Sequence, residues 1–365
     1  MVVPPILGRS RAVHRDPRSQ LNVALVIPLH GSAGIFGPSC ELCAELAREE
    51  INAAGGILAR ELSLHVVDGA RSPAGVAAEI EALVGLGAVD AVVGWHISAV
   101  RNAVAPRIAH RVPYVYTALY EGGETTPGVF LTGEVPSRQL IPPLRWLAHE
   151  RGARRWCIVG NDYVWPRQSA AVVHRHADDC GIEIVDEIFV QLGAETFDST
   201  LERVEASGSD AVLMLLVGDD GVLFNRAFAR RGLDDACLRF SPLMEENMLL
   251  ATGAEASRGI CAAAGYFESL LTEESLEFEA RYVRRFGVDA PTLNSLGESC
   301  YEGLTLLASL ARRARSLDVR AMSAVSDSVR YHGPRGTLSM RNSHLDQRIY
   351  LADACDLEFE VVAQV

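Results

Sequence analysis

The chain has 365 residues, of which 48% are hydrophobic and 22% charged, as is typical of a globular protein with apolar material for two cores. It carries 34 basic and 47 acidic residues, a formal net charge of −13. Such a charge repels phosphate backbones, so we expect no direct contact with nucleic acid and a small ligand or a protein partner instead.

The N-terminal residues indicate whether the protein carries an export signal. Their one apolar stretch is interrupted by Pro4 and Pro5, and no seven-residue apolar region of a signal peptide follows. No apolar run is long enough to span a membrane. We expect residues 1–19 to be flexible and the protein to be cytoplasmic. A wrongly chosen start codon would hide an export signal and make the protein periplasmic or extracellular.

Apolar strand-like runs alternate with helical patterns along the chain. The order begins with a strand at 22–29, a helix at 37–56, a strand at 61–69, a helix at 72–87 and a strand at 89–95. Continuous apolar strands that alternate with helices predict an α/β fold with parallel sheets covered on both faces. Further strands are predicted at 113–118, 156–160, 182–190, 210–217 and 238–243, and further helices at 99–111, 164–179 and 220–232.

Ligands of such sheets collect where strands end, because loops and helix N-termini present free N–H groups there. The segment GWHISAVRNAV at 94–104 is one such edge and carries Trp95, His96 and Ser98. Ser98 has two compatible interpretations, as the N-cap of the following helix or as a hydroxyl donor to a ligand.

Three more strand ends are candidates. Tyr163 and Trp165 follow the strand at 156–160, although such side chains are more often packing residues. The remaining two edges are LLVGDDG at 215–221 and SPLMEEN at 241–247. These four edges predict a binding site built from loops.

Catalytic signatures are missing from the sequence. It has no G-x-S-x-G, H-E-x-x-H or phosphate-binding glycine motif, so we expect no enzyme and no cofactor. A weaker alternative makes His96 a base with Glu245 or Glu246 as acid. Cys40 and Cys43 form a lone C-x-x-C without a second pair, so no metal is expected. The eight scattered cysteines favour reduced thiols.

Five short motifs occur in a recognisable order. They are S-x-x-R-x-A-V-x-P at 98–106, Y-x-x-x-Y-E-G at 116–122, G-x-D-Y-x-x-P-R at 160–167, P-x-G-T-x-x-M at 334–340 and N-x-H…R-I at 342–349. Together they resemble the type I periplasmic solute-binding family, which is Leu/Ile/Val-binding-like. More narrowly, they resemble its branch of urea-binding transport receptors and the amide receptor that regulates aliphatic amidase expression.

The resemblance implies two Rossmann-like lobes joined by three crossovers near residues 137, 267 and 325, with a ligand cleft between the lobes. The N-terminal lobe would hold residues 20–137 and 268–325. The C-terminal lobe would hold residues 138–267 and 326–365.

The resemblance also implies a site for a small amide. Ser98 and Tyr163 match ligand-holding positions, Tyr116 and Trp165 match aromatic walls, and Glu245 lies in a segment of the far lobe. The amide receptor has a threonine at the position of Ala118 and usually a tyrosine at that of Trp165, and His96 is also a departure, so the pocket should differ. The full expected set is Trp95, His96, Ser98, Tyr116, Thr117, Ala118, Tyr163, Trp165, Gly218 and Glu245.

Two roles remain open. A ligand sensor would hold a protein partner, such as an RNA-binding antitermination regulator, and release it on ligation. A transport receptor would deliver an amide, urea or branched-chain amino acid to an ABC permease. Homo-oligomers through the helix at 41–51 are a further expectation, although Leu42, Leu46 and Ile51 suit a core-facing helix equally well.

Overall fold

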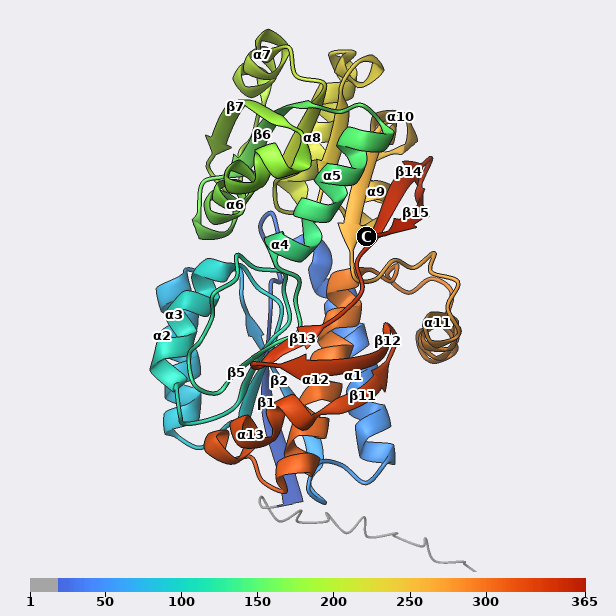
Figure 1. Cartoon of the computed structure of the whole chain (residues 1–365). Helices are drawn as coiled ribbons and strands as arrows, with labels where there is room; N and C mark the ends of the chain where they lie inside the picture. The colour runs from blue at the N-terminus through green and yellow to red at the C-terminus, as the bar shows by residue number, and fades with distance from the viewer. Residues whose placement is uncertain (1–18) are drawn as a thin grey trace, which may run out of the picture.

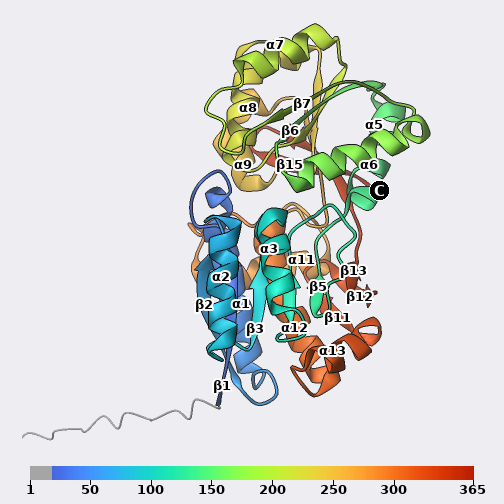
Figure 2. The ribbon, with the colours of Figure 1, turned by 90° about the vertical axis from the view of Figure 1, so that its left-hand side faces the viewer.

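The structure is a computed structural model that describes residues 19–365, so the expectation for residues 1–18 lies outside the described part. The chain forms two lobes stacked end to end, each built around one sheet with helices on both faces (Figures 1 and 2). This is the α/β architecture that the alternating pattern predicts.

The first sheet has eight strands in the order β11-β12-β13-β5-β4-β3-β1-β2. Strands β1 to β5 pair in parallel with one another, and β13 pairs in parallel with β5. On its other side β13 pairs antiparallel with β12, which pairs antiparallel with β11. The central strands are buried on both faces, which explains their continuous apolar sequences. The strands are β1 (Gln20–Ile27), β2 (Glu61–Asp68), β3 (Ala91–Gly94), β4 (Tyr114–Tyr116), β5 (Val129–Leu131), β11 (Arg330–Gly333), β12 (Gly336–Arg341) and β13 (His344–Asp346).

Helices cover both faces of this sheet, with α2 and α3 on one side and α1 and α12 on the other (Figure 2). Leu46 and Ile51 of α1 are buried, so the core-facing interpretation of this helix is confirmed for them. Cys40 and Cys43 are buried in the same helix. The helices are α1 (Gly37–Ala53), α2 (Pro73–Gly85), α3 (Ser98–Ile108), α11 (Glu273–Phe286), α12 (Ser295–Ala314) and α13 (Val319–Val325).

The second sheet has seven strands in the order β15-β14-β10-β9-β8-β6-β7. Five of them pair in parallel, and β14 and β15 add an antiparallel hairpin at one edge. Its strands are β6 (Arg155–Asn161), β7 (Glu183–Val190), β8 (Ala211–Leu215), β9 (Leu238–Ser241), β10 (Ile260–Ala264), β14 (Tyr350–Cys355) and β15 (Glu358–Gln364). Its helices are α4 (Pro136–Gln139), α5 (Ile141–Glu150), α6 (Val164–Cys180), α7 (Asp198–Ser207), α8 (Asp219–Arg230), α9 (Glu246–Thr252) and α10 (Ala254–Ser257).

The chain passes between the sheets three times, after β5, after β10 and after β13. The sequence places the third crossing near residue 325 and assigns residues 326–365 to the C-terminal lobe. This is wrong for residues 330–346, because β13 pairs with β5 and carries β11 and β12 into the first sheet. The third crossing is therefore the short segment between β13 and β14.

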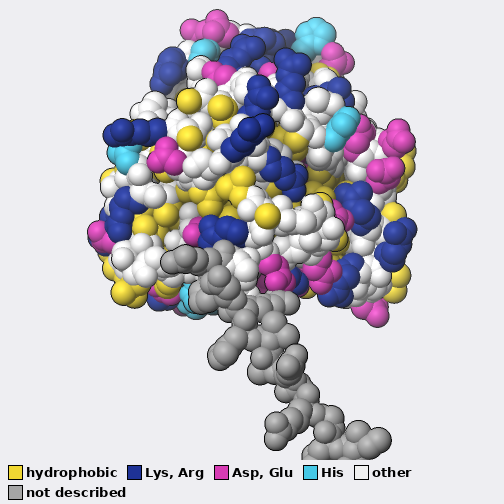
Figure 3. All heavy atoms as spheres, turned by 90° about the horizontal axis from the view of Figure 1, so that it is seen from below, with side chains coloured by type: hydrophobic (Ala, Val, Ile, Leu, Met, Phe, Trp, Pro, Cys, Tyr) yellow, Lys and Arg dark blue, Asp and Glu magenta, His cyan; other side chains and the backbone are white. Residues whose placement is uncertain are grey.

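The outer end of the first lobe is seen from below in Figure 3. Hydrophobic side chains gather near the centre of this face, with arginines and acidic side chains scattered around them. Of the helices in the described part of the chain, none has the length and apolarity needed to cross a membrane.

Candidate functional site

The two lobes meet where the carboxyl ends of their central strands face each other. A small cavity of about 10 Å³ lies there, which is room for about one water molecule. The lobes are therefore closed on one another in this structure. The cavity is lined by Trp95, His96, Ile97, Ser98, Tyr116, Ala118, Leu119, Tyr163, Trp165, Val217 and Leu243.

Seven of the ten residues expected from the sequence line this cavity. Trp95, His96 and Ser98 follow β3, Tyr116 and Ala118 lie at the end of β4 and just beyond it, and Tyr163 and Trp165 follow β6. The first five come from one lobe and the last two from the other. Parallel strands bring these separate segments to one edge, as the strand-end argument predicts.

Ser98 is the first residue of α3, and its side chain does not cap the helix. Ile97 occupies the N-cap position, and no side-chain hydrogen bond closes this end. The Ser98 hydroxyl oxygen instead accepts a hydrogen bond from Arg101 Nη1 at 3.3 Å. The capping interpretation of Ser98 is therefore wrong, because the helix begins one residue earlier than that role requires.

Arg101 is a buried cation next to Ser98, on the side of the cavity that the first lobe forms. It donates to Glu121 Oε1 at 2.7 Å and to Glu124 Oε2 at 3.0 Å. Its guanidinium lies 5.1 Å from the ring centroid of Tyr116 and 4.7 Å from that of Tyr120. This ion cluster was not predicted from the sequence, although Arg101 belongs to the motif at 98–106 and Glu121 to the motif at 116–122.

His96 is fully engaged within the protein. Its Nε2 lies 2.7 Å from the Tyr114 hydroxyl and its Nδ1 lies 3.3 Å from the carbonyl of Ile97. Burial lowers the pKa of His96 to about 3, and the charge of Arg101 adds to this effect. The neutral ring therefore contacts Tyr114 and the backbone of Ile97 within the cavity wall. The alternative of His96 as a catalytic base finds no support.

The aromatic walls include a buried donor without a partner in the described part of the chain, the indole N–H of Trp95. Trp95 packs edge-on against Phe36, with ring centroids 5.0 Å apart. Its indole Nε1 is buried and has no hydrogen-bond partner among the described residues. Tyr116 donates its hydroxyl proton to the carbonyl of His96 at 2.7 Å. Trp95 lines the cavity, so its indole N–H is a buried donor there without a partner in residues 19–365, and the Ser98 hydroxyl belongs to the same lining.

Three expected residues do not line the cavity. Thr117 points towards α12, where its hydroxyl accepts a hydrogen bond from Ser299 at 3.2 Å. Glu245 accepts from the backbone N–H of Ser295 at 2.7 Å, and burial raises its pKa to about 8. Gly218 lies beside Ser32 of the other lobe. A strand-end pattern locates these residues at the right edge but does not say which way the side chains of Thr117 and Glu245 face.

Hydrogen bonds next to Gly218 join the two lobes, and we call this group of bonds the latch. The backbone N–H of Asp219 donates to the carbonyl of Ser32 at 2.9 Å, and the Ser32 hydroxyl donates to Asp220 at 2.7 Å. Asn161 and the backbone N–H of Gly193 also donate to Asp220. The loop before α1 in the first lobe is thereby tied to the N-terminus of α8 in the second.

The three segments that cross between the lobes, here called the hinge, contain a buried ion cluster. Glu134 Oε1 accepts from the backbone N–H of Gly265 at 2.9 Å and from Arg335 Nη1 at 3.3 Å. Arg335 also donates to Glu298 at 2.5 Å and to Gln347. Glu134, Gly265 and Gln347 belong to the three different crossings, so this cluster ties all of them together.

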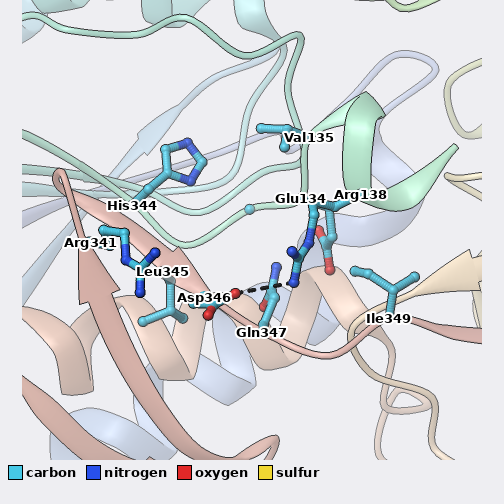
Figure 4. Close-up of a pocket in the computed structure, with 10 residues that line it drawn as sticks. Glu134, Val135, Arg138, Arg341, His344, Leu345, Asp346, Gln347 and Ile349 are labelled. Carbon is cyan, nitrogen blue, oxygen red and sulfur yellow. Dashed lines mark hydrogen bonds and ion pairs between the residues drawn. The ribbon is translucent and has the colours of Figure 1, made fainter. Parts of the chain in front are cut away.

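A second cavity, of about 270 Å³, opens beside this cluster (Figure 4). Its walls come from the first crossing, including Glu134 and Arg138, and from the segment around the third, including His344 and Gln347. Arg138 donates to Asp346 at 3.2 Å across it. The cavity therefore belongs to the hinge and lies apart from the residues expected to bind a ligand.

The buried neutral His96 predicts a pH dependence of stability. In the unfolded chain it binds a proton below a pH of about 6.5, whereas the folded chain takes up that proton only near pH 3, so stability is lost as the pH falls between these values. We expect the free energy of unfolding of the wild type to fall faster than that of His96→Asn, by up to about 1.4 kcal/mol per pH unit. Urea unfolding at pH 7, 6 and 5 measures this, and parallel curves would contradict it.

Comparisons with known proteins agree on the architecture. The profile described as periplasmic binding protein matches residues 20–356. The Leu/Ile/Val-binding protein homolog 6 of Brucella suis is 25% identical over 263 residues, which are 70% of this chain and 63% of the relative. The match thus spans less than two thirds of the length of that curated relative.

Solved structures share the fold at lower identity. A solute-binding protein of an ABC transporter from Rhodopseudomonas palustris BisB5, in complex with 3,4-dihydroxybenzoic acid, superposes with a TM-score of 0.84 at 22% identity, covering 95% of this chain and 97% of that one. The branched-chain amino acid transporter protein LivJ of Streptococcus pneumoniae, in complex with isoleucine, gives 0.83 at 18%, covering 95% and 99%. Because the family profile covers nearly the whole chain and both lobes superpose on solute-binding proteins, this chain is a non-catalytic member of the periplasmic binding protein family.

Proposed function

We propose that the chain is the solute-binding component of an ABC transporter and that the cleft between its lobes takes a small polar solute of the amide or urea type. The observation that carries this is the closed cleft, whose aromatic walls leave about 10 Å³ and include a buried indole N–H that has no partner among the described residues. Ligand pockets of this kind combine apolar walls with a few convergent polar groups. The proposal places the protein outside the cytoplasm, where a transport receptor works.

The size of the cleft favours a small ligand. A planar amide or urea offers one carbonyl oxygen and several N–H groups and has few heavy atoms. The indole N–H of Trp95 and the hydroxyl of Ser98 suit its carbonyl oxygen. Any solute larger than water requires the lobes or the walls to move, and aromatic acids and isoleucine, which the similar solved structures bind, require more movement than an amide or urea.

One observation favours the sensor as a second candidate. All eight cysteines are free, and seven of them are buried. Unpaired thiols in this number are more typical of reducing compartments than of secreted proteins. Thiol labelling of fractionated cells separates the two roles, because the sensor predicts free thiols in the cytosolic fraction and the transport receptor predicts a protein outside it.

A thermal-shift screen followed by calorimetry tests the ligand class. The panel contains acetamide, propionamide, urea, leucine and benzoate. A ligand at 100 times its dissociation constant should stabilise the protein by about 2.7 kcal/mol. We expect amides or urea to give the largest shifts, and a panel in which only leucine or benzoate stabilises the protein would refute this ligand class.

Ser98 provides a direct mutational test. Its hydroxyl does not cap α3, so Ser98→Ala should leave the helix intact and lower ligand affinity by about 1–3 kcal/mol through the loss of a buried partner. Ser98→Asn should also bind poorly, because the longer side chain would occupy a cavity that has room for only about one water molecule. Calorimetry on both variants measures this, and wild-type affinity in either would remove Ser98 from the site.

A further inference from the structure

We propose that the buried carboxylates Glu121, Glu124 and Asp220, only partly balanced by Arg101, make this cleft select uncharged carbonyl ligands and reject carboxylates. The inference rests on the proposed function and names the residues that decide specificity within it. None of the four residues lines the cavity, so they are specificity-determining residues that act through the cleft wall.

Arg101 connects this charge cluster to the wall of the cleft. Its Nη1 donates to the Ser98 hydroxyl oxygen at 3.3 Å, and the Ser98 hydroxyl in turn bonds to Tyr116, which acts to lower the pKa of that tyrosine against the effect of burial. A ligand that replaces Tyr116 as the partner of Ser98 can accept from this hydroxyl, and the indole N–H of Trp95 is a second donor, which has no partner among the described residues. A ligand therefore has to present an acceptor to this wall, and both a carbonyl oxygen and a carboxylate meet that requirement.

Charge separates these two ligand types. The side chains of Arg101, Glu121 and Glu124 are 3%, 4% and 9% exposed, so solvent screens them poorly. Oε2 of Glu121 is buried without a hydrogen-bond partner among the described residues. Burial acts to raise the pKa of Glu124, but bonds from Thr126 and Arg101 bring it below its usual value, which keeps this carboxylate ionised.

The other lobe adds a further negative charge. Asp220 is 1% exposed and is held by the Ser32 hydroxyl, the Asn161 amide and the backbone N–H of Gly193, all of them neutral donors. Burial raises the pKa of the cavity-lining Tyr163 well above its usual value, and the charges of Glu121 and Asp220 contribute from opposite lobes. The negative charges of Glu121 and Asp220 therefore both act on a residue that lines the cleft.

Among the four buried groups named here, one cation stands against three carboxylates, and His96 adds no charge because it is neutral. A carbonyl oxygen gains the two donors without a net repulsion. A carboxylate gains the same donors, and the N-terminus of α3 attracts it, but it also meets the excess negative charge in a region of low dielectric, where repulsion is strong. Like-charge juxtaposition of this kind is a common way to reject a competing ligand.

Matched pairs of ligands that differ mainly in charge test the inference. Calorimetry at pH 8 compares acetamide with acetate and benzamide with benzoate on the wild type, Glu121→Gln and Glu124→Gln. The glutamine side chains keep the shape and an acceptor for Arg101. The control is Glu202→Gln, which removes one charge from an exposed side chain on α7.

We expect the wild type to prefer the amide of each pair by about 100-fold, and each cluster variant to reduce this ratio about tenfold, while Glu202→Gln leaves it unchanged. A wild type that binds acetate or benzoate as tightly as the amide would overturn the inference. So would an amide preference that neither cluster variant changes, and that result would leave the proposed function standing. A wild type that binds neither member of either pair overturns the proposed amide ligand and the inference with it.

Discussion

Replacing Arg335 by methionine is expected to lower the free energy of unfolding by about 3–5 kcal/mol, because it leaves buried carboxylates without their cation. The Arg335 side chain is 2% exposed, and those of Glu134, Glu298 and Glu302 are 4%, 0% and 0% exposed. Both oxygens of Glu302 already lack hydrogen-bond partners among the described residues. Chemical unfolding at pH 8 measures the loss.

The pH dependence of this loss identifies its cause. Burial raises the pKa of Glu298 to about 7 even beside Arg335, and without the arginine it should rise further. A carboxyl whose folded pKa lies above its unfolded value contributes stability at low pH that is lost as the pH rises through the folded value. Arg335→Met should therefore be less destabilised at pH 5 than at pH 8.

An exposed ion pair supplies the control for Arg335. Arg71 pairs with Glu79, and the two side chains are 43% and 36% exposed. Arg71→Met should cost only about 0–1 kcal/mol, as surface pairs do. If Arg335→Met cost no more than Arg71→Met, the hinge cluster would not hold the three crossings together.

Eight strands of the parallel core could be predicted because their sequences carry a strong signal, whereas the parallel strands β5 and β10 were not predicted. All eight predicted strands are present, since a strand such as β3 is apolar along its whole buried length. The hairpin strands β11 to β13 were not predicted, because they are short and mix buried with exposed residues. Their membership of the first sheet depends on the pairing of His344 with Leu131, which are far apart in the chain.

The candidate site divides in a similar way. Strand ends identify segments, and Trp95, Tyr116 and Trp165 were placed correctly at one edge of the two sheets. Side-chain direction depends on tertiary packing, which explains why Thr117 and Glu245 turn towards α12 instead. The ion clusters around Arg101 and Arg335 join distant segments, so no spacing in the sequence predicts them.

Gly218 is the second position at which a small change should have a large effect. It has a φ of +51°, and a Cβ atom there would lie 1.8 Å from the carbonyl oxygen of Ser32 in the other lobe. Gly218→Ala should therefore separate the lobes at the latch while each lobe stays folded. Because a ligand that needs the closed state binds in proportion to its population, we expect affinity to fall by roughly 100-fold.

Gly208 offers a control because it also has a positive φ but makes no such contact. Its φ is +61°, and a Cβ atom would meet nothing within 4 Å. Gly218 has a ψ of −119°, which glycine alone adopts readily, whereas Gly208 has a ψ of 35° and lies in the left-handed region. Gly218→Ala therefore carries the larger backbone strain, and it alone obstructs closure. Calorimetry with a ligand from the screen and small-angle scattering measure the two effects. A lower affinity and a larger radius of gyration for Gly218→Ala alone would establish that closure depends on the latch, whereas equal affinities in the two variants would show that it does not.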